Sequence, residues 1–189
     1  QLEGANHGWQ WDRARTLRPS SPWVYFGQKD LWVPMKPQEP EQGPGLRGFL
    51  PLVYHDRAQV MMLHGGQGGN FTKDGLADRV WTYDAYANTW TMLPAAPVMP
   101  GQRAHQAMCY LPDQNKVLLV GGSYGKADKR TWLYDLENNT WTEAKPKGDV
   151  PQFRLPVLFD PVSRTALKFA DSAQGASVWQ YDPVANEWR

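Results

Sequence analysis

Thr131-Trp132-Leu133-Tyr134-Asp135-Leu136-Glu137-Asn138-Asn139-Thr140-Trp141 is the stretch of this chain of 189 residues that decides its fold. Trp132 and Tyr134 alternate as side chains do on a pleated strand, and Asp135 and Asn139 are turn residues that tolerate a left-handed backbone. A second strand begins at Thr140. The stretch therefore predicts a β-hairpin closed by a tight turn.

Near-copies of this hairpin stand at 80–90 and 178–188, and the spacing of nine residues between their tryptophans returns at 23–32. The four pairs hold eight of the ten tryptophans in the chain: Trp23 and Trp32, Trp81 and Trp90, Trp132 and Trp141, Trp179 and Trp188. Such a fixed spacing indicates an internal repeat. Because one small sheet cannot bury both of its faces, the repeated tryptophans are predicted to pack between neighbouring sheets as a continuous core.

A second, inner hairpin is predicted upstream of each of the last three outer hairpins. In the third unit, strands at 103–110 and 116–120 flank a turn at 112–115, and the second strand ends at the doublet Gly121-Gly122. The second unit repeats this pattern from Arg47 to the doublet Gly65-Gly66. The fourth unit has Ala170-Asp171 where the doublet is expected, so the end of its second strand is left open. The first unit shows an outer hairpin, and residues 1–22 contain no recognisable inner one.

These features together resemble kelch repeats: four strands per unit, a Gly-Gly doublet closing the second strand, Trp-x-Tyr-Asp on the third and Asn-x-Trp on the fourth. The resemblance to the galactose oxidase/kelch-like superfamily implies an all-β fold, a β-propeller of four-stranded antiparallel kelch blades. About 3.5 blades are expected here, with an N-terminal segment at 1–45 and blades at 46–97, 98–148 and 149–189. Such propellers typically close with six or seven blades. Further blades or a partner are therefore expected to cover the open faces.

Composition excludes several classes of protein. With 20 basic and 19 acidic residues the net charge is +1, which lacks the strong positive field of a nucleic-acid binder. No apolar run has the length of a membrane span, and 41% hydrophobic residues suffice for a globular core. A start at Gln1 is typical of a secreted protein after removal of its signal peptide, so an extracellular or periplasmic location is expected. Cys109, the single cysteine, is expected to be buried and inert.

Binding residues are predicted on one face of the propeller. The turns within hairpins are short, whereas the connections at 34–46, 66–78, 94–101, 123–129 and 146–152 are long. Long irregular loops on a rigid scaffold usually carry recognition, and we call the face that holds them the long-loop face. Candidate binding residues on this face are Arg47, Gln67, Asn70, Phe71, Arg103, Tyr124, Lys126 and Arg154.

The three arginines each stand where an innermost strand is predicted to begin, so they are expected to ring the channel mouth. Converging guanidinium groups suit a carboxylate, a phosphate or an acidic loop of a partner, and in some kelch domains arginines near this mouth hold acidic peptide segments. The alternative is that each arginine braces a neighbouring loop within the propeller. The residue pattern leaves both readings open.

An enzyme is not predicted. Galactose oxidase-like copper enzymes need a tyrosine linked to a cysteine, but Cys109 and Tyr110 are adjacent on a strand and point to opposite faces. His7, His55, His64 and His105 show no close metal-ligand spacing, so neither a metal nor a cofactor is expected.

The function expected first is a protein-binding or assembly module that acts through the long-loop face. Two alternatives stay open. One is a carbohydrate-binding or carbohydrate-active extracellular propeller, suggested by the spare aromatics Trp9, Trp11, Phe71 and Tyr124. The other is a structural part of a larger enzyme whose site lies outside this chain. Nucleic acid is not expected as a partner.

Overall fold

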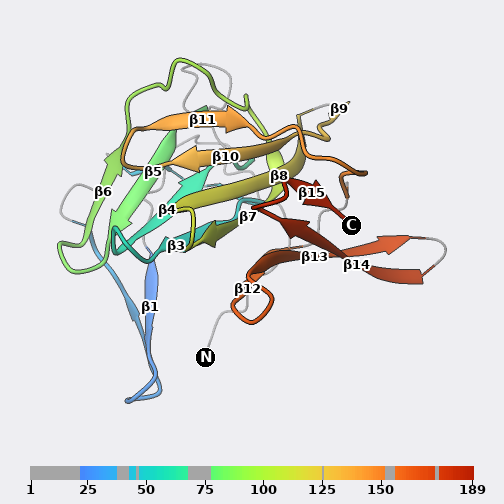
Figure 1. Cartoon of the computed structure of the whole chain (residues 1–189). Coiled ribbons are helices and arrows are strands. Elements are labelled where there is room, and N and C mark those ends of the chain that lie inside the picture. The colour runs from blue at the N-terminus through green and yellow to red at the C-terminus, as the bar shows by residue number, and fades with distance from the viewer. Residues whose placement is uncertain are drawn as a thin grey trace.

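The computed structural model describes residues 22–37, 43–45, 47–67, 78–124, 126–151, 156–172 and 175–189. They form four antiparallel sheets, which we call blades 1 to 4 (Figure 1). No helix in these ranges is both long enough and apolar enough to cross a membrane. The fold is all-β, as the sequence predicted.

The strands follow one another along each blade in chain order. Blade 1 is the hairpin of β1 (Trp23–Phe26) and β2 (Leu31–Pro34). Blade 2 has the order β3 (Leu52–His55), β4 (Val60–His64), β5 (Val80–Asp84) and β6 (Thr89–Met92). Blade 3 has the order β7 (Ala104–Leu111), β8 (Lys116–Tyr124), β10 (Thr131–Asp135) and β11 (Thr140–Glu143), and the short β9 (Lys126–Ala127) pairs with β8. Blade 4 has the order β12 (Val157–Asp160), β13 (Thr165–Ser172), β14 (Gly175–Asp182) and β15 (Glu187–Trp188).

The outer hairpins are closed by a bond between a tyrosine and the residue five positions later. In blade 3 the Tyr134 hydroxyl donates to Oδ1 of Asn139 at 2.7 Å, and Asn139 has the left-handed φ of 49° that this turn requires. The Asp135 carboxylate accepts from the backbone N–H of Asn138 at 3.0 Å and holds the other side of the turn. The same tyrosine bond closes the other outer turns in Tyr25–Asp30, Tyr83–Asn88 and Tyr181–Asn186, and also the inner turn of blade 3 in Tyr110–Asn115. In the outer hairpins of blades 2 to 4, the repeated Tyr-Asp-x-x-x-Asn pattern therefore closes the turn.

The asparagine of each outer turn also ties its blade to the preceding one. Nδ2 of Asn139 donates to the Pro94 carbonyl, which follows the last strand of blade 2, at 3.0 Å. Equivalent bonds join Asn88 to Lys36 at 2.9 Å and Asn186 to Ala144 at 2.6 Å. One side chain thus fixes both the turn and the position of the next blade.

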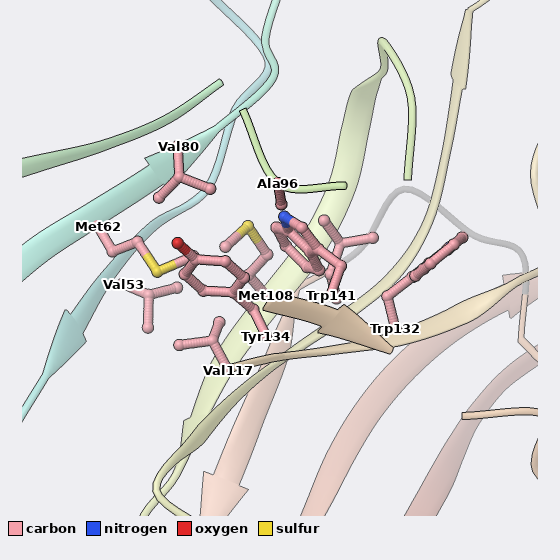
Figure 2. Close-up of a cluster of buried hydrophobic side chains, with 10 residues drawn as sticks. Val53, Met62, Val80, Ala96, Met108, Val117, Trp132, Tyr134 and Trp141 are labelled. Carbon is pink, nitrogen blue, oxygen red and sulfur yellow. The ribbon is translucent and has the colours of Figure 1, made fainter. Parts of the chain in front are cut away.

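The cores lie between the blades. In Figure 2, Val53 and Met62 of blade 2 face Tyr134 and Trp141 of blade 3, and all four side chains are buried. A second cluster fills the space between blades 3 and 4. Cys109 belongs to the second cluster and Tyr110 packs against the first, which confirms that these neighbours point to opposite faces.

The prediction for the tryptophans holds in blades 2 to 4 and is wrong in blade 1. Trp81, Trp132, Trp141 and Trp188 are buried, and Trp90 and Trp179 are half-buried. In contrast, Trp23 is 59% exposed and Trp32 57% exposed. The reason is that among the described residues no sheet covers the blade 1 face that carries these two tryptophans.

The glycine doublets end the pairing between the second and third strands, with a backbone that other residues rarely adopt. β4 ends at His64, whereas β8 pairs with β10 as far as Val120 and then runs on to Tyr124, so the prediction that it ends at Gly121-Gly122 is wrong. Gly65 and Gly66 have φ of 73° and 100°, and a Cβ on Gly65 would lie 2.4 Å from the Arg103 carbonyl oxygen. Gly121 and Gly122 repeat the conformation with φ of 71° and 92°. In blade 4, where the doublet is absent, β13 continues to Ser172 and forms with β14 a long ribbon that projects from the sheet (Figure 1). β13, whose end the sequence left open, therefore stays paired with its third strand past the place where the doublet stands in blades 2 and 3.

Candidate binding face

The order of the strands separates two ends of each blade. In an antiparallel meander, the turns between the first and second strands lie opposite the connection between the second and third. β7 contacts both β3 and β12, so the first strands of consecutive blades lie side by side. The beginnings of β3 and β7 and the ends of β4 and β8 therefore gather at one place, which we call the axial end of the long-loop face.

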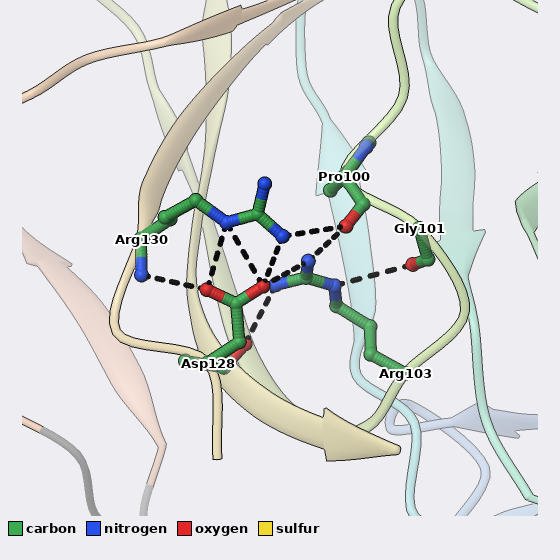
Figure 3. Close-up of polar contacts among 6 residues, drawn as sticks. Pro100, Gly101, Arg103, Asp128 and Arg130 are labelled. Carbon is green, nitrogen blue, oxygen red and sulfur yellow. Dashed lines mark hydrogen bonds and ion pairs between the residues drawn. The ribbon is translucent and has the colours of Figure 1, made fainter. Parts of the chain in front are cut away.

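Arg103 is buried at this axial end, with 3% of its surface exposed. Its Nη1 donates to the Gly121 carbonyl at 2.9 Å, and its Nη2 donates to the Pro100 carbonyl and to Asp128 Oδ2, the latter at 2.7 Å (Figure 3). Burial lowers the pKa of the Arg103 guanidinium, and the adjacent Asp128 carboxylate counteracts that change. Arg103 holds the end of β8, the 100–101 connection and Asp128 together.

Asp128 joins Arg103 to a second arginine that reaches solvent. Nη2 of Arg130 lies 2.6 Å from Asp128 Oδ2, and about half of the Arg130 side chain is exposed. The Arg130 guanidinium also lies 5.2 Å from the centre of a Trp132 ring, within the range of a cation–π contact. Partial burial would raise the pKa of Asp128, but hydrogen bonds from Arg130 and the charges of both arginines lower it to about 2. The carboxylate is therefore ionised, and the three side chains carry a net charge of +1.

Arg47 occupies the same place in blade 2. Its Nη1 donates to the Gly65 carbonyl at 3.2 Å and its Nε donates to the Pro44 carbonyl. Arg103 has the same two kinds of partner, the first glycine of the doublet and the proline three residues before the arginine. These contacts are those expected of a brace within the propeller. The spacing Pro-x-x-Arg, followed 18 residues after the arginine by glycine, was visible in the sequence and would have revealed the brace.

The third arginine of the predicted ring, Arg154, lies outside the described residues. Arg47 and Arg103 each stand 13 residues before the first residue of β4 or β8, whereas Arg154 stands 11 residues before β13. Like the other two arginines, Arg154 follows a proline, Pro151, by three residues, and its place in the ring stays a prediction.

The remaining predicted binding residues are only partly described. Gln67 is exposed, and its backbone pairs with Gly48 through two hydrogen bonds of 2.7 Å. Tyr124 and Lys126 pair through their backbones in β8 and β9, and the positions of their side chains are not described. Asn70, Phe71, Trp9 and Trp11 lie outside the described residues.

His64 is a buried residue of this region to which the sequence reading gave no role. Its ring is fully buried and lies 5.1 Å, edge-on, from the Trp141 ring, while its backbone carbonyl accepts from Gln106 Nε2 at 2.6 Å. Neither ring nitrogen reaches a hydrogen-bond partner among the described residues. Burial lowers the pKa of His64 to about 3, and the positive charges of Arg103 and Arg47 act in the same direction. The backbone of Asp78 raises this pKa, but by less. The imidazole is therefore neutral at pH 7.

Phe49 and His105 form a strained aromatic pair that the sequence reading missed. Each stands two residues after the arginine of its blade and has a left-handed backbone, with φ of 55° and 62°. This conformation costs a residue other than glycine about 1–2 kcal/mol. The ring centres are 4.3 Å apart, and the backbone N–H of His105 donates to the Phe49 carbonyl at 2.8 Å. An aromatic contact of this kind is worth about 0.5–1.5 kcal/mol, so the ring pair offsets part of this cost.

Lys168 of β13 was also missed. It is fully buried at the position where blades 2 and 3 have Leu63 and Leu119, and burial lowers its pKa to about 8. A lysine inside a leucine pattern was a signal available in the sequence. It lies on the face of blade 4 that packs against blade 3, where it pairs with Val157 at the beginning of β12.

A search of the described residues for a metal site finds no three His, Cys, Asp or Glu side chains placed to hold one ion.

Two comparisons with known proteins agree with the repeat. The sequence profile of the Kelch motif family matches residues 108–148, which include all of β8 to β11. Kelch-like protein 23 of Mus musculus is 25% identical over 166 residues, which cover 87% of this chain and 27% of that protein. The chain thus spans about a quarter of the length of this relative.

Proposed function

Since this chain is a kelch-repeat protein whose sheets are propeller blades, we propose that it is a protein-binding module that acts through its long-loop face. The likeness to a kelch-like protein supports a role in protein interaction. The assignment to this face rests on the braced group of Arg103, Asp128 and Arg130. Arg103 is buried and holds Asp128 in place, while Arg130 is half exposed.

The roles of the arginines differ. Arg103 is buried and committed to three carbonyls and Asp128, so it positions the group and does not meet a partner. Arg130 is half exposed and the neighbouring Lys129 is exposed. With the net charge of +1 on the braced group and a further charge on Lys129, the surface suits an acidic segment of a partner.

The test is binding of a fluorescein-labelled peptide of alternating glutamate and glycine to the purified chain, followed by fluorescence polarisation at low and at physiological salt. We expect Arg130→Glu to abolish binding of this peptide. The matched control is Arg57→Glu, because Arg57 is exposed and pairs with Glu137 at 3.5 Å beside the turns at the other end of the blades.

An equal loss of binding in the two variants would show that only net charge matters and would refute the assignment to the long-loop face. Retention of binding by Arg130→Glu would do the same. A lysine-glycine peptide of equal length serves as the probe for the opposite charge and should not bind.

A further inference from the structure

We propose that two copies of this chain dock head to tail. The face of blade 1 that carries Trp23 and Trp32 in one copy covers the exposed face of blade 4 that carries Leu158 and Val178 in the other. This interface is separate from the long-loop face and does not depend on the proposed function.

The two faces match the interface that already joins blades 3 and 4. There the buried Trp188 belongs to the second cluster, and its Nε1 donates to the Thr131 hydroxyl at 3.1 Å. Trp32 has the place of Trp188 in its hairpin, and Val178 has the place of Thr131 in its blade. Trp32 and Val178 are both 57% exposed. A second copy can therefore lay Trp32 on Val178 and continue the packing that the chain uses between its own blades.

Blade 1 lacks the hydrogen bond by which each later blade is tied to its predecessor. In blades 2 to 4 the amide of the turn asparagine donates to a carbonyl of the preceding blade. Blade 1 has Asp30 at this position, and Asp30 accepts from the Tyr25 hydroxyl at 2.7 Å as the asparagines do. A carboxylate has no N–H to donate, so Asp30 needs a donor from whatever covers this face. A positively charged donor forms the strongest bond with it.

Blade 4 offers such a donor on its exposed face. Arg189 follows β15, and its Nε donates to Oε1 of Gln180 at 2.9 Å. Gln180 pairs with Leu167, which in turn pairs with Leu158, so Arg189 lies on the same face as the exposed Leu158. The equivalent strand pairs of blades 2 and 3 carry no charge: Thr82 with Thr91, and Leu133 with Thr142. At these repeat positions, charges of opposite sign thus stand on the two faces that we propose to meet.

The repeat also places these two charges close together. Between blades 3 and 4, Asn186 donates to the carbonyl of Ala144, two residues after Thr142, at 2.6 Å. Thr142 has the place of Arg189 in its blade. Asp30 has the place of Asn186 in its turn. Two residues of strand span about 7 Å, a distance that the long arginine side chain bridges. Docking in this manner therefore forms an ion pair between Asp30 of one copy and Arg189 of the other.

The number of blades fits closure by two copies. A head-to-tail contact closes into a ring or continues into an open chain of copies. The described residues form four sheets, so two copies supply eight. Propellers have about four to eight blades, so eight sheets suffice for a ring. A closed dimer contains the proposed interface twice.

The experiment is sedimentation velocity over a concentration series. We expect the parent to dimerise, and Asp30→Lys and Arg189→Glu should each raise the dissociation constant about tenfold or more, because like charges then meet at both interfaces. An equimolar mixture of these two variants should dimerise again, since one interface regains the parental pair and the other holds the reversed pair. The control Asp56→Lys makes the same change of charge in an exposed inner turn of blade 2 and should behave as the parent.

Asp30→Asn keeps the test valid if lysine disturbs the left-handed turn. Asparagine closes the other outer turns, so this variant keeps the hairpin and removes the charge, and its dissociation constant should rise about threefold. A parent that stays monomeric at every concentration would overturn the proposal. A dimer that both Asp30→Asn and Arg189→Glu leave intact would do the same. A mixture of the two charge variants that stays monomeric would show that a further blade or a different protein covers these faces.

Discussion

His64 shows how a single buried side chain couples this fold to pH. Its folded pKa of about 3 lies below the ordinary value of 6.5, so between these values the unfolded chain binds the proton and the folded chain does not. Stability contributed by the neutral ring is therefore complete above about pH 6.5 and is lost progressively as pH falls. At pH 5 the loss is about 2 kcal/mol.

The test is His64→Val, which places the residue found at the equivalent Val120 of blade 3. Although the smaller side chain loses the contact with Trp141, the variant should show a flatter decline in unfolding free energy between pH 7.5 and pH 5. Guanidinium titrations at the two pH values measure this. Some slope will remain because burial also lowers the pKa of His55. An unchanged decline of the unfolding free energy between pH 7.5 and pH 5 would show that His64 does not cause the loss of stability at low pH.

Asp128 illustrates the difference between a buried and an exposed ion pair. Asp128→Asn keeps the shape of the side chain but leaves the guanidinium groups of Arg103 and Arg130 close together without the carboxylate between them. Because Arg103 is buried, we expect a loss of about 3 kcal/mol in unfolding free energy. The control is Asp113→Asn, which breaks the exposed pair with Arg164 and should cost less than about 1 kcal/mol. Equal losses in urea titrations would mean that Asp128 does not hold the axial end together.

At the scale of the element, the outer hairpin of blade 3 depends on Asn139, which closes the turn and also bonds to the preceding blade. Asn139→Gly keeps the left-handed turn but loses the bonds to Tyr134 and to the Pro94 carbonyl, so we expect a cost of about 1–2 kcal/mol. Asn139→Ala adds backbone strain and should cost about 1 kcal/mol more. Chemical denaturation of the two variants measures the difference. If alanine proved no worse than glycine, strain at this turn would not limit stability.

The hairpins were also the elements most open to prediction. The turn at 112–115 and the strand at 131–135 lie where the spacing of tyrosine, asparagine and tryptophan placed them, because a turn is decided by residues close together in the chain. The strand predicted at 116–120 begins as expected but runs through the glycine doublet to Tyr124. The end of β13 was not predictable in the same way. Once Ala170 and Asp171 replace the glycines, it depends on pairing with β14 along its whole length.

At the scale of the whole molecule, the two terminal blades expose faces whose equivalents are buried elsewhere. Leu158 and Val178 of blade 4 are each 57% exposed. The corresponding residues of blade 3 are covered by blade 4: Cys109 is buried against it, and the buried Thr131 accepts a hydrogen bond from Trp188. On blade 1, Trp23 and Trp32 are exposed on the face that the later blades turn toward their predecessors. Apolar surface of this kind favours association until a further blade or a partner covers it.

We therefore predict that the double variant Leu158→Thr and Val178→Thr self-associates less than the parent. Threonine retains the preference for strands and removes apolar area. Light scattering over a concentration series measures the mean mass of each protein. The control is Val184→Thr in an outer turn, where the side chain is 90% exposed and no sheet face is involved. A mean mass that the double variant leaves unchanged would exclude this face as the origin of association.

The sequence by itself determined the all-β class, the repeat, the hairpin turns and the burial of the later tryptophans. Each of these depends on local spacing or on a periodicity that recurs in the chain. Tertiary structure alone decided that Arg103 pairs with Asp128, that Trp23 and Trp32 are exposed, and that Phe49 meets His105. These outcomes depend on which groups the folded chain brings together or leaves uncovered. Arg103 and Asp128 stand 25 positions apart, and Phe49 and His105 belong to different blades, so no local pattern reaches them.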